Sequence, residues 1–166
     1  MNKRIIINFI GKIILIEVML MILPLLVSLI YGDGDTRGFL YTMIPAGIIG
    51  FALMKVKQKQ GRMSSRDGYF IVAAAWIIIS LIGAMPLYIN GGFPTYWNAL
   101  FEIVSGFTTT GASILVKPEE LGHGVLFWRS FTHWIGGMGV LVFVLMVMPM
   151  ENDNSMHLVR AEVPGP

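Results

Sequence analysis

Long apolar runs dominate this sequence and limit what it can fold into. The first covers residues 5–30 and contains two charged side chains, Lys12 and Glu17. A helix needs about 20 mostly apolar residues to cross a bilayer, and 55% of the side chains here are hydrophobic while 13% are charged. A soluble core of this size does not need so much apolar surface. The sequence therefore predicts an all-α integral membrane protein.

Four segments fit transmembrane helices, namely residues 4–30, 39–54, 68–89 and 124–150. The second is short and is expected to cross with local bilayer thinning or with Lys55 and Lys57 reaching the interface. Residues 31–38 are rich in glycine and aspartate, which cannot lie bare in hydrocarbon, so they are predicted to form an aqueous loop. The first run is too long for a signal peptide and is predicted to be a retained helix.

Positive charges are concentrated beside these spans. Residues 55–67 hold the densest positive run, and Lys3 and Arg4 precede the first span. The positive-inside rule places both segments in the cytoplasm. By alternation, residues 90–123 lie on the outer side and the tail 151–166 is cytoplasmic.

Several function classes find no support in the composition. The chain has no cysteine, which removes disulfides and thiolate chemistry, and its net charge of +2 does not predict nucleic-acid binding. His123 and His157 show no ligand-like spacing, so no metal site is predicted. Because the spans contain no paired carboxylates and no nucleophile beside a base, an enzyme is not expected.

The segment between the last two spans carries the candidate chemistry. Residues 95–107 are apolar enough to enter a bilayer, but as a helix they would be only about 20 Å long and could not cross it. The residues that follow are poor in helix formers, which predicts an extended return path. They are Thr108, Thr109, Thr110, Gly111, Ala112 and Ser113. A short helix in and an extended strand out form a re-entrant pore loop, one helix and one filter loop in addition to the four spans.

Such a loop can bind a monovalent cation through its backbone. If the carbonyls of residues 109–112 point to a common axis, they can replace the hydration shell of the ion. Gly111 is expected to supply the positive or otherwise forbidden dihedral that keeps successive carbonyls pointing one way. Read alone, Thr-Thr-Thr-Gly fits an ordinary turn between helices better. The long span on either side favours the pore.

Three separated motifs resemble one known family. They are residues 101–113, 134–139 and 160–166. In this order they resemble the TrkH-type subunits of bacterial potassium-uptake systems, in the Trk/Ktr/HKT superfamily. The loops at 29–34 and 64–69 look like those of the same subunits, so the resemblance covers essentially the whole chain.

The resemblance implies a pore of four linked repeats, each with an outer helix, a pore loop and an inner helix. Residues 68–150 would form the first repeat, residues 1–67 two additional transmembrane helices with a cytoplasmic basic loop, and residues 151–166 a cytoplasmic tail. One repeat cannot encircle an ion. The chain is therefore expected to be a fragment that lacks the remaining three repeats, which its Pro-Gly-Pro ending favours, or a subunit that assembles with other copies.

The resemblance also implies a function. It implies potassium uptake across the bacterial cell inner membrane, with residues 108–113 binding the transported potassium ion and with no cofactor. The implied partners are membrane lipid, a second copy in a homodimer and a cytoplasmic TrkA-like nucleotide-binding regulatory subunit. The alternative is a non-conducting membrane interaction or assembly module. Discrimination between potassium and sodium stays open at this point.

Three polar residues are candidates for supporting the filter. Glu102, in the predicted pore helix, is expected to brace the loop through hydrogen bonds rather than to attract cations. Arg129 and His133 lie one turn apart and are expected to position the loop backbone.

Other residues have a plainer interpretation. Gly136, Gly137 and Gly139 fit close helix packing at least as well as a hinge. Glu17 is expected to pair with a group on a neighbouring helix rather than to bind an ion. Lys12 is expected to reach the cytoplasmic surface.

Overall fold

The structure is a computed structural model that describes residues 3–56 and 65–147, and all regular elements in those ranges are helices. They are α1 (Lys3–Leu20), α2 (Ile22–Tyr31), α3 (Thr36–Met54), α4 (Ser65–Ile89), α5 (Tyr96–Phe107), the short 3-10 helix η1 (Pro118–Glu120) and α6 (His123–Val147). The predictions for residues 57–64 and 148–166, which include most of the basic loop and the whole tail, lie outside the described residues.

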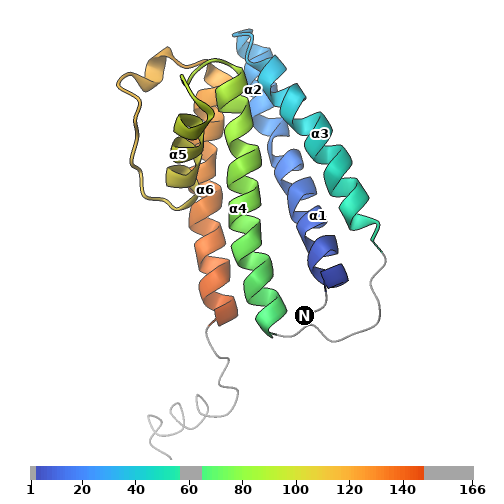
Figure 1. Ribbon diagram of the computed structural model, residues 1–166. Coiled ribbons are helices and arrows are strands. Elements are labelled where there is room, and N and C mark those ends of the chain that lie inside the picture. The colour runs from blue at the N-terminus through green and yellow to red at the C-terminus, as the bar shows by residue number, and fades with distance from the viewer. Residues whose placement is uncertain (1–2, 57–64, 148–166) are drawn as a thin grey trace, which may run out of the picture.

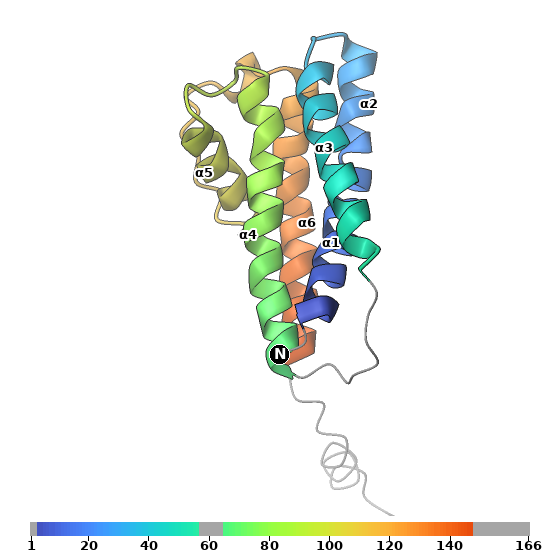
Figure 2. The same ribbon diagram turned by 45° about the vertical axis from the view of Figure 1, so that its right-hand side comes forward.

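The long helices run side by side, and the short α5 packs against α4 and α6 at one end of the bundle (Figure 1). Figure 2 shows α5 on one side of α4 and α3 on the other. Three segments are long and apolar enough to cross a membrane, namely Lys3–Tyr31, Thr36–Met54 and Arg66–Ile89. With its 25 residues, α6 also has the length of a span. The predicted all-helical, multi-pass architecture is confirmed.

The first span, predicted as one helix, is interrupted. The break falls at Met21, between α1 and α2, because the ring of Pro24 clashes with the carbonyl one turn earlier and its nitrogen carries no hydrogen to donate there. Two backbone hydrogen bonds carry the helical path across the break, from the Met21 N–H to the Glu17 carbonyl (2.9 Å) and from the Leu25 N–H to the Met21 carbonyl (3.2 Å). The two helices therefore still form one 29-residue segment.

The second and third spans begin earlier than predicted. α3 starts at Thr36 and has 19 residues, so it is less short than the apolar run alone indicates. The Asn90 side chain at the end of α4 fixes this start: its amide oxygen accepts from the Gly38 N–H (3.0 Å), and its amide nitrogen donates to the Asp35 carbonyl (2.9 Å). A polar side chain thus joins the ends of two spans.

The loop between α2 and α3 holds the start of α6. Asp33 Oδ2 accepts from the backbone N–H of His123 (2.8 Å) and contacts the ring Nδ1 of the same residue (2.6 Å), while Asp35 Oδ2 accepts from the Val125 N–H (3.3 Å). The first N–H groups of a helix have no partner within it, so these carboxylates cap α6. The hydrogen bonds from His123 lower the pKa of Asp33, whereas burial raises the pKa of Asp35.

The buried core surrounds the place where α5 meets α4 and α6. Its members are Met21, Phe39, Ala84, Leu87, Phe93, Ala99, Ile103, Phe107, Val125 and Trp128. Trp128 is fully buried, and its ring N–H donates to the Gly83 carbonyl at 2.9 Å. The core therefore fixes α5, the helix that precedes the candidate filter, against both of its long neighbours.

Candidate functional site

The short helix predicted over residues 95–107 is present as α5. Thr95 is its N-cap: the backbone there is extended, and the side-chain oxygen accepts from the Asn98 N–H at 3.3 Å. The 12 residues of α5 correspond to a length of about 18 Å, too short to cross a bilayer. A short helix between the last two long helices is thus confirmed as an element of the structure.

A closed helix cap turns the chain from α5 into the loop. The Thr109 N–H donates to the Gly106 carbonyl (2.9 Å) and the Thr110 N–H to the Ser105 carbonyl (3.0 Å). This pair of bonds is the Schellman pattern, whose residue in the left-handed region is usually glycine. Here that residue is Thr109, with φ 56°. No sequence pattern predicts this conformation at Thr109, because a β-branched side chain rarely adopts it.

Gly111 also has a positive φ, 73°, as predicted. A Cβ added there would meet no atom within 4 Å, so backbone conformation rather than space favours glycine. In a regular extended chain successive carbonyls point to opposite sides. Two left-handed residues, Thr109 and Gly111, with one residue between them break that alternation.

The loop has an open side and a covered side. Residues 108–114 are all exposed, whereas Glu102 and Ser105 behind them are 1% and 5% exposed. The chain leaves the end of α5 and returns along it toward the end where α5 begins (Figure 1). Oxygens on the open side are therefore accessible to an ion, and polar side chains on the covered side can hold the loop in place.

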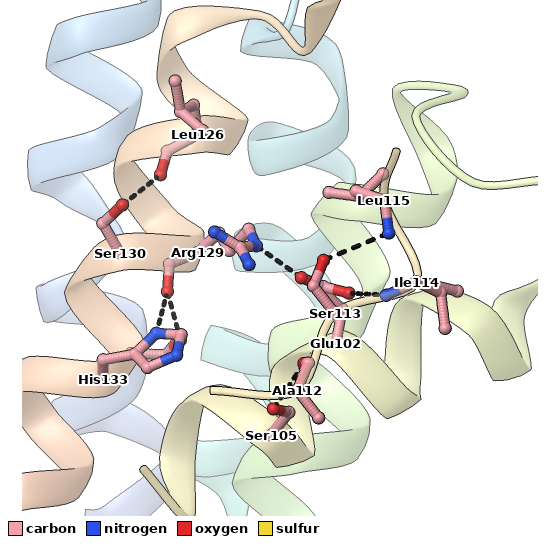
Figure 3. Close-up of polar contacts among 11 residues, drawn as sticks. Glu102, Ser105, Ala112, Ser113, Ile114, Leu115, Leu126, Arg129, Ser130 and His133 are labelled. Atoms are coloured by element: carbon pink, nitrogen blue, oxygen red, sulfur yellow. Dashed lines mark hydrogen bonds and ion pairs between the residues drawn. The ribbon is translucent and has the colours of Figure 1, made fainter. Parts of the chain in front are cut away.

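Glu102 and Arg129, two of the three residues expected to support the filter, contact each other. Arg129 Nε, on α6, donates to Glu102 Oε1 at 2.5 Å, and Glu102 Oε2 accepts from the Ile114 N–H at 3.2 Å (Figure 3). A buried carboxylate needs such partners because removing it from water is costly. One side chain of α5 thus joins α6 to the returning loop.

His133 does not position the loop as expected. Its ring Nδ1 lies 3.0 Å from the Arg129 carbonyl oxygen, one turn back on its own helix (Figure 3). The prediction paired His133 with the loop because it lies one turn from Arg129. The ring instead satisfies a backbone carbonyl of α6.

Sequence reasoning missed Ser105. Its Oγ donates to the Ala112 carbonyl oxygen at 2.6 Å (Figure 3). The signal was available, since Ser105 lies three residues after Glu102 and therefore on the same face of the helix. Two loop hydroxyls also bond to each other: Thr108 Oγ1 lies 2.8 Å from Thr110 Oγ1.

The glycines of α6 serve close packing. A Cβ on Gly136 would collide with the backbone of Phe107, whose carbonyl carbon would lie 2.7 Å away. At Gly137 the nearest atom would be Thr109 Cγ2 at 3.9 Å, an ordinary contact. Packing rather than a hinge explains Gly136, which lets α6 pass directly against the end of α5.

Glu17 does not have the partner expected for it. Its side chain is 4% exposed, and among the described residues neither carboxylate oxygen has a hydrogen-bond partner. A Cβ placed on Gly83 of α4 would lie 3.2 Å from Glu17 Oε1 and 3.4 Å from the Phe107 ring. The prediction of an ion pair or hydrogen bond to a neighbouring helix is wrong for the described part of the chain.

Known proteins resemble this chain along its whole length. The TrkH model, described as a cation transport protein, matches residues 35–166. The Trk system potassium uptake protein TrkH of Escherichia coli is 39% identical over 168 residues, covering 100% of this chain and 35% of the relative. An uncharacterized cation transporter of Methanocaldococcus jannaschii is 36% identical over 157 residues, covering 95% of this chain and 33% of its own length.

A solved structure has the same fold. The crystal structure of the potassium transporter TrkH from Vibrio parahaemolyticus superposes with a TM-score of 0.82 at 30% identity, covering 97% of this chain and 36% of that chain. The chain thus spans about a third of the length of the relatives and of the solved structure that it matches.

Proposed function

The chain belongs to the TrkH family of cation transport proteins, and we propose that it forms part of a pore for potassium uptake. The observation that carries the proposal is the loop after α5, which has positive φ at Thr109 and Gly111 and an exposed face. The choice of potassium as the ion rests on relatives that are named potassium uptake proteins. Because the chain spans 35% of the E. coli relative, the pore is completed by three further repeats or by other copies of the subunit.

Potassium binds to the loop through oxygen atoms. The ligands are backbone carbonyls within residues 108–113, which replace part of the hydration shell of the ion as it passes. Non-helical backbone at membrane depth is tolerated where it lines a watery cavity, and the exposed face of this loop fits that condition. The reaction is transport of an ion and involves no covalent step and no cofactor.

Glu102 and Arg129 support the filter from behind. Their ion pair, with an N–O distance of 2.5 Å, links α5 to α6, and the second carboxylate oxygen of Glu102 holds the Ile114 N–H. A filter needs fixed oxygens, since an ion is bound well only when the ligands keep their positions. The pair therefore acts by positioning the loop rather than by contacting potassium.

The membrane arrangement follows from charge. We place the protein in the bacterial inner membrane, with the N-terminus and the tail 151–166 in the cytoplasm, because Lys3, Arg4 and the run at 55–67 are the main positive segments. Residues 1–67 then form two transmembrane helices with a basic loop, and residues 68–150 form one pore repeat. The proposed partners are lipid, a second copy in a homodimer and a TrkA-like nucleotide-binding subunit.

A complementation experiment tests the filter. Full-length protein carrying Gly111→Asp is expected to fail to restore growth of a potassium-uptake-deficient bacterium at low external potassium. The matched control is Gly91→Asp, because Gly91 has φ 76° and no atom within 4 Å of an added Cβ, and lies in the turn after α4. Loss of growth with Gly111→Asp and normal growth with Gly91→Asp supports the assignment. Normal growth with both refutes it.

A flux measurement tests what the described repeat does by itself. Potassium flux through liposomes containing the 166-residue chain is expected to be absent, since one loop leaves the other faces of the ion without ligands. Full-length protein in the same liposomes is expected to conduct. Absence of flux through the full-length protein would favour a non-conducting assembly module instead.

A further inference from the structure

The loop returns antiparallel to α5 and is held at two points. Ser105 bonds to the Ala112 carbonyl, and Glu102 bonds to the Ile114 N–H. The step from Ser105 back to Glu102 on the helix covers about 4.5 Å, and the step from Ala112 on to Ile114 in an extended chain covers about 6.6 Å. The two bonds therefore fit an extended loop that runs along α5 in the direction opposite to the helix.

Alternation in an extended chain then fixes the direction of the intervening carbonyl. In an extended chain, the carbonyl of one residue and the N–H of the residue two positions later point to the same side. The N–H and the carbonyl of the residue between them point to the opposite side. The Ala112 carbonyl and the Ile114 N–H both face α5. The Ser113 carbonyl therefore faces the open side of the loop.

We propose that Ser105 is a positioning residue of the filter, which holds the Ala112 carbonyl out of the ion path and leaves the Ser113 carbonyl as the next ligand. The inference rests on the proposed pore function and changes its ligand set, because Ala112 was expected to contribute its carbonyl. The hydroxyl is 2.6 Å from that oxygen and the Ser105 side chain is 5% exposed, so the donor side of the bond is shielded from water.

Ser105 then affects which ion passes. Ion selectivity depends on the number of coordinating carbonyls and on how freely they move. Without the hydroxyl, the Ala112 carbonyl is free to turn toward the ion and to disturb the set of ligands. Selectivity should change more than total conduction, which distinguishes positioning from general structural support.

The experiment uses full-length protein in liposomes and measures the potassium-to-sodium flux ratio. Ser105→Ala is expected to lower the ratio roughly three- to tenfold, the equilibrium effect of losing one hydrogen bond. Ser105→Cys, with a weaker donor of similar size, is expected to give an intermediate ratio and carries the test if the alanine variant does not insert. Ser130→Ala is the matched control, because Ser130 bonds to the Leu126 carbonyl of its own helix (3.0 Å) and is exposed.

The outcomes separate this inference from the proposed function. An unchanged ratio in the Ser105 variants, or an equal fall in potassium and sodium flux, would overturn the positioning role of Ser105. If wild-type protein conducts no potassium, the pore proposal itself fails. A lowered ratio in both Ser105 variants, with the Ser130→Ala ratio at the wild-type value, supports the positioning role.

Discussion

Single residues in this chain depart from the usual rules at the candidate filter. Thr109 occupies the left-handed position of a helix cap that glycine usually fills. Strained backbone tends to be retained where function needs it. Thr109 lies two residues before Gly111, which also has a positive φ, so both residues orient the carbonyls of one short segment.

Two buried glutamates provide a residue-scale test. Glu17 has no hydrogen-bond partner among the described residues, whereas Glu102 is held by Arg129 and by the Ile114 N–H. An unsatisfied buried polar group costs about 1–3 kcal/mol. In the 166-residue chain, Glu17→Leu is therefore expected to raise the thermal unfolding temperature.

The matched variant is Glu102→Leu, which leaves Arg129 partly buried without its partner and is expected to lower the unfolding temperature. Both can be measured by tryptophan fluorescence on heating in detergent. A fall in unfolding temperature with Glu17→Leu would show that Glu17 has a partner and would contradict this interpretation.

The positive φ of Gly111 could be predicted from its residue type, whereas that of Thr109 could not. A glycine directly after three threonines indicates a positive φ, and Gly111 has it. No local signal indicates that a threonine adopts one. Glu102 and Arg129 are 27 residues apart in the sequence. Their contact follows from how α5 packs on α6, and sequence spacing alone does not predict it.

At the scale of elements, the crossing of α6 over the end of α5 depends on glycine. Gly136→Ala is expected to destabilise the protein and to impair potassium uptake, because a methyl group there meets the Phe107 backbone, which cannot move aside easily. Overpacking of this kind costs typically about 1–3 kcal/mol. Thermal unfolding and growth at low potassium measure the two effects.

Gly137→Ala is the control for this crossing. The added methyl group would lie 3.9 Å from Thr109 Cγ2, an ordinary contact. Gly137→Ala should retain uptake and even gain a little stability, since alanine favours a helix more than glycine does. Equal loss of stability in both variants would indicate a general intolerance of α6 to substitution and contradict the contact-based explanation.

The cap on α6 predicts a dependence on pH. Hydrogen bonds from His123 lower the pKa of Asp33 from its usual value of 3.8. A carboxylate with a lowered folded-state pKa adds stability above its unfolded pKa, and this stability is lost as pH falls through the folded value. Asp33→Asn is therefore expected to lower the unfolding temperature at pH 7 and to have less effect below pH 3.8.

Glu119→Gln serves as the control, because Glu119 is an exposed carboxylate of η1, the short helix that precedes α6 in the chain. It is expected to change the unfolding temperature little at either pH. A constant effect of Asp33→Asn across the pH range would mean that the charge of Asp33 does not stabilise the α6 cap.

The elements themselves could largely be predicted. The apolar runs predicted the long helices, and the short length of the apolar segment 95–107 predicted α5. The break at Met21 was missed, although Pro24 was visible, because a proline can also lie inside a continuous transmembrane helix, as Pro45 does in α3. The hydrogen bonds by which Asp33 and Asp35 cap α6 join residues 90 positions apart, so no local sequence pattern predicts them.

For the whole molecule, the described helices form a support on which one side of the candidate filter loop is fixed and the other is left open. A pore repeat needs this arrangement, because its ligands must face an ion that is shared with other loops. Composition and hydropathy predicted the membrane environment. The direction of each carbonyl depends on Ser105, Glu102 and the two left-handed residues together, and sequence patterns do not give that geometry.

The most direct test of the central claim is to locate the ion. Crystals of the full-length protein grown with thallium or rubidium in place of potassium would give anomalous density for the bound cation. A peak is expected on the open side of residues 109–113, at coordination distance from backbone carbonyl oxygens of this segment other than that of Ala112, which Ser105 holds. A clear peak elsewhere in the protein, with none beside this loop, would contradict it.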